Sequence, residues 1–151
     1  MLHRVIEAEV VPACEEAGIG QIVWSPMAQG VLSGKYQPGE VAPAGSRASG
    51  GEGAQMIERW MTTDVLQAVQ RLRPIANDLG ITMSQMALAW VLANPNVSAA
   101  IVGASRPEQI VENVAAIEVQ LTPDVLHAID EALGDTIITD PDLTQSPNPR
   151  P

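Results

Sequence analysis

The residues best suited to chemistry gather in two segments, and the first is WSPMAQGVLSGKY at positions 24–36. It follows the run 19–24, whose β-branched apolar residues between Gly and Ser-Pro predict a buried strand. The Trp24 indole is a flat surface suited to stacking on a planar ring. Donors for phosphate oxygens and one cation are present in Ser25, Ser33, Gly30, Gly34 and Lys35. The alternative is a Gly-rich turn with Trp24 packed in the core.

The second segment is GASRPEQIVEN at positions 103–113, after the apolar run VSAAIVG at 97–103. Pro107 suits the first position of a helix, and the free N–H groups and dipole of a helix N-terminus favour an anion. Ser105 and Arg106 are placed to bond that anion directly. One side of the helix can line a pocket wall, with Gln109, Glu112 and Asn113 at spacings of three and four. The alternative is a capped helix with polar surface residues.

Both segments occupy the same kind of position, directly after a predicted strand. In parallel βα proteins, ligands bind beyond the carboxyl ends of the strands. Two such loops, each carrying a cation, favour one extended ligand with two anionic parts.

The elements that must position these segments are two strands and several helices. Apolar periodicity predicts helices over 4–17, 63–79, 84–94, 107–116 and 121–133, with a further short helix within 52–62. Buried strands alternating with amphipathic helices indicate a parallel α/β architecture. A closed βα barrel needs eight strands and about 250 residues. We therefore predict the C-terminal portion of a (β/α)8 TIM barrel, namely its last two strands with their helices and the C-terminal helix, over 1–134, followed by a Pro-rich tail over 135–151.

Composition excludes several classes of function. The net charge of −10 argues against a nucleic-acid-binding surface and against an anionic membrane surface. The single cysteine, Cys14, permits no internal disulfide, and no apolar run approaches the roughly 20 residues of a membrane span. The first ten residues lack the apolar core of a signal peptide. We expect a soluble cytoplasmic protein without membrane insertion.

WSPMAQGVLSGKY and IVGASRPEQIVENV resemble the nucleotide-binding segments of aldo-keto reductases, and are most similar to the branch that contains potassium-channel β-subunits. The resemblance runs from Leu2 to about Leu133. It implies NADPH as cofactor, with the choice of NADP over NAD resting on the branch. It implies that Trp24 stacks on the nicotinamide and that a loop folds over the pyrophosphate, formed by Ser25, Pro26, Met27, Gln29, Gly30, Ser33 and Lys35. It also implies an adenosine contact from Arg47, and contacts to the 2′-phosphate, ribose and adenine from Gly103, Ser105, Gln109, Glu112 and Asn113.

The resemblance does not supply catalytic residues. The family reduces carbonyl compounds with a tyrosine acid assisted by lysine, aspartate and histidine, all from the N-terminal half of the barrel. Tyr36 lies in the cofactor loop and does not match that acid. The two histidines, His3 and His127, are predicted to lie on helices, His127 at helical distance from Asp124 and Asp130. We assign no catalytic or metal-binding residue and expect no turnover of a small carbonyl substrate by the chain alone.

Two other interpretations stay open at this point. The chain is also compatible with a non-catalytic module, which binds nucleotide as a redox sensor, acts like a channel β-subunit, or completes a barrel with an N-terminal partner chain. A truncated gene product without an independent role is the other. Exposed half-barrel surface in either case predicts self-association.

Overall fold

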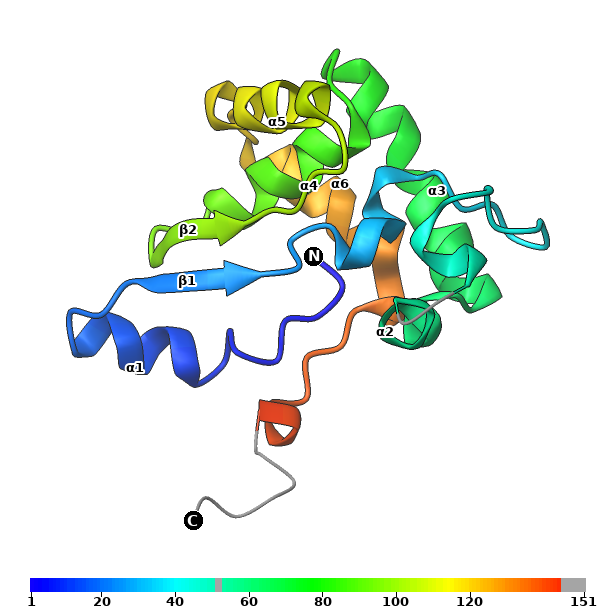
Figure 1. The fold of residues 1–151 in the computed structure, drawn as a ribbon. Helices are drawn as coiled ribbons and strands as arrows, with labels where there is room; N and C mark the ends of the chain where they lie inside the picture. Colours follow the sequence, from blue (N-terminus) through cyan, green and yellow to red (C-terminus); the bar gives the residue numbers. More distant parts are fainter. Residues whose placement is uncertain (51–52, 145–151) are drawn as a thin grey trace.

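The computed structural model describes residues 1–50 and 53–144, and it has a mixed α/β fold (Figure 1). Two strands are present, β1 (Gln21–Trp24) and β2 (Val97–Ile101). The helices are α1 (Val10–Glu16), α2 (Ala54–Ile57), α3 (Thr63–Asp78), α4 (Met83–Leu92), α5 (Pro107–Val114) and α6 (Pro123–Leu133). Short 3-10 turns are η1 (Ala28–Ser33), η2 (Arg47–Ser49), η3 (Glu58–Trp60), η4 (Ala115–Glu118), η5 (Gly134–Thr136) and η6 (Pro141–Thr144). The α/β class is confirmed, while membership of an eight-stranded barrel stays a prediction.

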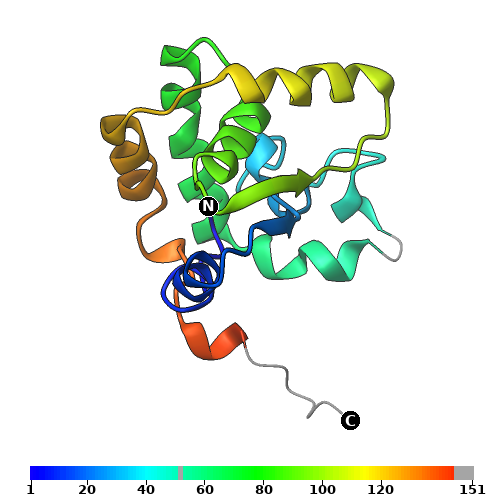
Figure 2. The same ribbon diagram turned by 90° about the vertical axis from the view of Figure 1, so that its left-hand side faces the viewer.

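The two strands form one parallel sheet, in which Trp24 pairs with Ile101 at the carboxyl end. Figures 1 and 2 show the strands side by side, with α5 beyond β2 and α1 beyond β1. Asn96 fixes the other end, because its backbone oxygen accepts from Gln21 N at 2.8 Å and its side-chain oxygen accepts from Gln21 Nε2 at 2.6 Å. The Asn96 amide also donates to Ile19 O at 2.9 Å. These bonds join the amino ends of the two strands. The register shifts between Gln21 and Ile22, and the parallel pairing from Ile22 to Trp24 brings both carboxyl ends to the same edge.

Helices cover one face of this sheet only. Helix α4 packs against β2. The residues that alternate onto the opposite face are exposed, namely Ile22, Trp24, Ala99 and Ile101. The apolar runs predict strands covered on both faces, and within the described residues that prediction is wrong for this face. The sheet therefore presents an apolar surface to solvent.

The hydrophobic core lies among α3, α4 and α6, where α3 packs against both other helices. Each of the three helices begins at a threonine, and the hydroxyl oxygens of Thr62, Thr82 and Thr122 accept from the backbone N–H three residues later. At α4 the Gln85 side chain returns a bond to Thr82 N at 2.9 Å, which completes a capping box. Among the described residues, no helix is long and apolar enough to cross a membrane.

Helix α1 begins later than its apolar pattern predicts, at Val10 instead of residue 4. The cause is Pro12, which has no N–H and whose ring clashes with the carbonyl four residues earlier in a longer helix. Residues 5–9 form turns instead. His3 is consequently not on a helix: it pairs with Ile138 in an isolated parallel bridge, supported by a bond from Ile138 N to Leu2 O at 2.8 Å.

The N-terminal segment is also tied to α6 by a salt bridge between Arg4 and Asp130. The Arg4 guanidinium lies 4.5 Å from the ring centre of Trp90, so it joins α6 to α4 through the N-terminal segment. His127 lies on the exposed side of α6, as predicted, and its nearest ionic contact is with Glu131 at 3.5 Å, one turn further along the helix. Asp130, at helical distance from His127, bonds Arg4.

Truncating the buried side chain of Leu72 on α3 tests the position of this core. Leu72 is 1% exposed, so we expect Leu72→Ala to lower the free energy of unfolding by about 2–5 kcal/mol, measured by urea denaturation. Gln67→Ala on the exposed side of the same helix is the control, with an expected change within about 0.5 kcal/mol. Equal losses in the two variants would contradict the assignment of the buried face.

Tyr36 allows a second test, because its ring belongs to the core while its hydroxyl has no hydrogen-bond partner within the described part of the chain. An unpaired buried hydroxyl costs about 1–3 kcal/mol. We expect Tyr36→Phe to keep the free energy of unfolding or raise it by up to about 1 kcal/mol. Tyr36→Ala, which removes the ring, is expected to lose about 3–5 kcal/mol. A clear loss in the Phe variant would show that the hydroxyl does have a partner.

Candidate functional site

Trp24 ends β1 on the uncovered face of the sheet, and its side chain is 66% exposed. The alternative interpretation of Trp24 as a core residue is therefore wrong in this structure. An indole face that remains accessible at the carboxyl end of a strand is available for stacking on a planar ring. The first segment thus begins with its aromatic surface open to a ligand.

The turn after Trp24 has an unusual backbone. Three residues other than glycine have positive φ angles, Ser25 at 54°, Ala28 at 47° and Gln29 at 56°. Each such residue costs about 1–2 kcal/mol relative to ordinary backbone, so surrounding contacts must hold the turn. Strain of this kind concentrates at functional sites.

A hydrogen-bonded chain of side chains provides those contacts. The Gln29 amide donates to Ser25 Oγ at 2.9 Å, and Trp60 Nε1 donates to the Gln29 amide oxygen at 3.0 Å. Gln29 is only 7% exposed and Trp60 only 2%. Gln29, predicted as part of a loop that folds over the pyrophosphate, is a buried residue of that loop, and its side chain helps to hold the turn.

The far end of the first segment is fixed by α3. Gln70 donates to the carbonyl oxygens of Gly34 at 3.1 Å and Tyr36 at 2.9 Å, and Arg73 donates to Gly34 O at 2.9 Å. Gly34 has a φ of 73°, and a Cβ there would lie 2.5 Å from Met83 Sδ, so the turn requires glycine. Both ends of residues 25–36 are therefore anchored to helices or turns of the body.

Lys35 is the exposed cation between these anchors. Its ammonium nitrogen lies 3.3 Å from where a Cβ on Gly30 would stand, so glycine leaves room for the side chain to lie over the turn. The Ser33 hydroxyl is already used within the loop, donating to Gly30 O at 2.7 Å. Pro26 is buried and Met27 half-buried against the core. The predicted loop residues thus form one compact turn with Lys35 on its surface.

The second segment leaves β2 next to this turn, because Ile101 pairs with Trp24. The Gln109 amide oxygen accepts from Ser105 N at 2.8 Å, Ser105 Oγ at 3.2 Å and Arg106 N at 3.3 Å. The N–H groups of Ser105 and Arg106, directly before the helix, are therefore occupied by a side chain of that helix. An anion at this position has to displace the Gln109 amide.

The remaining predicted residues are placed as follows. Gly103, Ser105 and Glu112 are exposed, and Asn113 is half-buried on α5. Arg47 lies on η2, and its aliphatic part packs on Gly53, where a Cβ would come within 2.8 Å of Arg47 Cγ. The structure therefore brings both segments to one edge of the sheet, while Arg47 lies on η2 and packs against Gly53.

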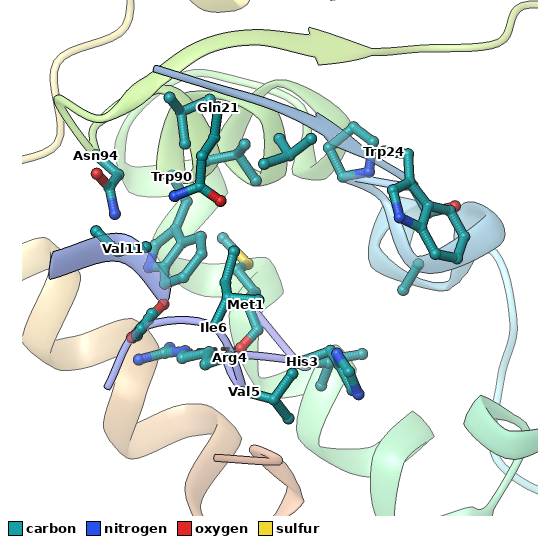
Figure 3. Close-up of a pocket in the computed structure, with 18 of the residues that line it drawn as sticks. Met1, His3, Arg4, Val5, Ile6, Val11, Gln21, Trp24, Trp90 and Asn94 are labelled. Atoms are coloured by element: carbon teal, nitrogen blue, oxygen red, sulfur yellow. Dashed lines mark hydrogen bonds between the residues drawn. The ribbon is translucent and has the colours of Figure 1, made fainter. Parts of the chain in front are cut away.

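A pocket of about 850 Å³ opens beneath β1. Figure 3 shows Trp24 at one end of it and Trp90, Met1 and Arg4 toward the other. Burial lowers the pKa of the Met1 amino group to about 5, with Arg4 contributing, and burial likewise lowers the pKa of His3 and raises that of Glu7. All three pKa shifts favour the neutral form, which is the direction that partial removal from water produces.

Sequence reasoning missed the residues that support the site. Trp60 lies outside both segments and has no motif around it, and Gln70 and Arg73 look like ordinary residues of a helix surface. Their supporting roles are evident only from the residues that they contact in the folded structure. In the described residues, no group of three or more His, Cys, Asp or Glu is arranged to hold a metal ion.

The observed donors fit a dinucleotide in part. The accessible Trp24 indole lies at the carboxyl edge of the sheet, the Lys35 ammonium lies by Gly30 in the turn that follows it, and Gly103 follows the end of β2 with open space beside it. The N–H donors of Ser105 and Arg106 can bond a phosphate only after the Gln109 side chain moves. The strained turn after β1, in contrast, has its conformation without a ligand. This arrangement suits a long, flat ligand carrying negative charge.

Comparisons with known proteins agree with the resemblance found in the two segments. The chain is 44% identical over 133 residues to a probable voltage-gated potassium channel subunit beta of Arabidopsis thaliana, which covers 87% of this chain and 40% of the relative. It is 43% identical over 130 residues to a protein of the same name from Oryza sativa subsp. japonica, with 85% and 39% covered. A putative subunit of that kind from Schizosaccharomyces pombe is 45% identical over 134 residues, with 86% and 38% covered.

The chain thus spans about two fifths of the length of these relatives. The model of the Aldo/keto reductase family matches residues 1–133, which include both strands and both candidate segments. The chain belongs to the aldo/keto reductase family.

Proposed function

We propose that this chain supplies the NADPH-binding part of an aldo-keto reductase barrel that reduces a small carbonyl compound to an alcohol. The observation that supports the proposal most strongly is the exposed Trp24 indole at the carboxyl end of β1, beside the anchored loop that carries Lys35 and next to the end of β2. The family membership makes a nicotinamide dinucleotide the natural ligand for that surface.

Each end of the site has a distinct role in this proposal. NADPH, when bound, supplies the hydride that passes to the carbonyl carbon. Trp24 orients the nicotinamide ring by stacking, and Lys35 neutralises charge on the pyrophosphate together with the turn of Ser25, Pro26, Met27, Gln29, Gly30 and Ser33. The adenosine end is held by Arg47, Gly103, Ser105, Gln109, Glu112 and Asn113. Turning the Gln109 amide away from Ser105 frees donors for the 2′-phosphate.

The proton for the carbonyl oxygen comes from an acid outside the two segments. Tyr36 is 1% exposed and its hydroxyl lies in the core, so it does not face Trp24's open surface. Further strands, from the same polypeptide or another one, complete the barrel and bring the acid in our proposal. We also propose a cytoplasmic location, where NADPH is available.

The uncovered apolar surface supports a barrel completed by further elements. Besides the sheet face, α5 and the turn after it expose an apolar stripe at helical spacing, formed by Ile110 (57%), Val114 (56%) and Ile117 (66%). Each strand has one unpaired edge in the described sheet. Parallel sheets are normally buried on both faces, and surfaces of this kind mark interaction sites. The greater length of the relatives is consistent with such a completion.

A second candidate function rests on the names of the relatives, which are voltage-gated potassium channel β-subunits. In this alternative the chain binds nucleotide within a regulatory module, and hydride transfer is not its biological role. Tight NADPH binding by a completed barrel that shows no aldehyde reduction would favour the regulatory module over the enzyme.

Nucleotide binding tests the proposal through Trp24. We expect the chain to bind NADPH saturably in isothermal titration calorimetry, and Trp24→Ala to weaken binding about 5- to 150-fold, because stacking on an aromatic ring contributes about 1–3 kcal/mol. Ile22→Ala is the matched control, because Ile22 is equally exposed on the same strand face, at 67%, but lies away from the carboxyl end. Absence of binding by the folded chain, or equal losses in the two variants, would refute the assigned site.

The exposed apolar surface of the sheet and of α5 leads to a separate prediction about self-association of the chain. We expect light scattering to show concentration-dependent self-association of the chain alone. Introducing Lys at Ile110 and Ile117 should shift the chain toward monomer, because charged side chains resist burial in an apolar contact. Lysine reduces the magnitude of the net charge of −10, so a shift cannot come from greater general repulsion. Gln67→Lys on α3 is the control, and a monomeric parent chain would count against the need for a covering partner.

A further inference from the structure

We infer that Trp60 is a positioning residue for the turn 25–30, acting through Gln29. Trp60 ends η3 and lies 31 residues after Gln29, outside both segments that carry the family resemblance. Its effect on the turn is a property of the structure alone, whereas its effect on cofactor affinity rests on the proposed function.

Bonds within residues 25–30 alone do not keep this turn in its observed backbone conformation. Ser25, Ala28 and Gln29 all adopt positive φ angles without being glycine, and Gln29 and Gly30 interrupt the helical geometry of η1. Backbone bonds such as Ala28 N to Ser25 O at 2.9 Å close small local turns but do not connect the loop to the body. A connection from outside has to select this conformation over ordinary ones.

Gln29 provides such a connection, because its side chain joins the turn to Trp60. Its side chain is buried and uses both ends, receiving a bond from Trp60 Nε1 at 3.0 Å and giving one to Ser25 Oγ at 2.9 Å. Ser25 directly follows Trp24, so the bonds reach the backbone that carries the exposed indole. Without the indole N–H, the Gln29 oxygen is a buried acceptor without a donor, and the amide is free to turn away.

The Trp60 ring is in turn held in place by the residues around it. It is 2% exposed, the Arg59 guanidinium lies 4.3 Å from its ring centre, and the His3 ring lies in a T-shaped arrangement with it, 6.2 Å between ring centres. Its ring therefore has little freedom to reorient, and the position of its N–H is set by the core. Because this N–H donor has a fixed position, it can favour one conformation of the strained turn over others.

The test replaces Trp60 by Phe, which keeps a large aromatic ring and removes the N–H. Trp90→Phe is the matched control, because the Trp90 ring packs on Arg4 rather than on the turn. Amide hydrogen exchange in peptides covering 25–30 is expected to become at least about 10-fold faster in Trp60→Phe and to stay unchanged in Trp90→Phe. Peptides from α3 and α4 report global stability in the same samples.

Gln29→Met removes the same bond from the other side and leaves Trp60 in place, so it serves if Trp60→Phe does not fold. In the Gln29→Met background, adding Trp60→Phe should cause no further change of exchange at 25–30, whereas a purely structural role would give the same increment in both backgrounds. Unchanged exchange at 25–30 in Trp60→Phe or Gln29→Met overturns the inference.

Cofactor affinity separates this inference from the proposed function. If the chain binds NADPH, Trp60→Phe should weaken binding at least about fivefold while Trp90→Phe does not. If the chain does not bind NADPH but exchange at 25–30 still accelerates in Trp60→Phe, the positioning role stands and only the proposed function fails. Unchanged affinity together with accelerated exchange would show that the turn is not part of the binding site and overturn the functional half of the inference.

Discussion

The parallel pairing of β1 and β2 is the constraint on which the candidate site depends. The Asn96 side chain and backbone bond Gln21 and Ile19 at one end, and after a register shift between Gln21 and Ile22 the strands pair regularly up to Trp24 and Ile101 at the other. A one-residue slip would turn the Trp24 indole to the other face of the sheet. The segments 24–36 and 103–113 lie far apart in the sequence and meet at one edge because the strands before them pair in parallel.

The same edge combines a rigid part and an adjustable part. The turn after β1 is held from both sides, by the Trp60–Gln29–Ser25 bonds and by Gln70 and Arg73 of α3. The loop after β2 is capped by its own Gln109, which an anion can replace. In the proposed site, a preorganised turn would lower the free-energy cost of binding a ligand, and displacement of the Gln109 amide would open the donors of Ser105 and Arg106 to an anion. The uncovered sheet face next to this edge is the surface that further elements would cover in the proposed barrel.

Much of the fold follows from local sequence patterns, because caps, prolines and apolar periodicity act within a few residues. Thr62, Thr82 and Thr122 mark the starts of three helices, and both strands lie inside the predicted apolar runs. The late start of α1 was foreseeable from Pro12, whose clash reaches only four residues back. The exposed state of Trp24 was not, since apolar strands usually imply two covered faces. The roles of Trp60, Gln70 and Gln109 depend on partners in space, which no pattern within the sequence specifies.

The most direct test of the account is to map, by NMR, which backbone amides of the chain respond to NADP⁺. If the two segments form one site on the edge set by the strand pairing, chemical-shift changes will concentrate in 24–36 and 103–113, with the Ser105 and Arg106 amides shifting as Gln109 is displaced. Changes confined to one segment, or centred on α6 and the residues after it, would contradict the account.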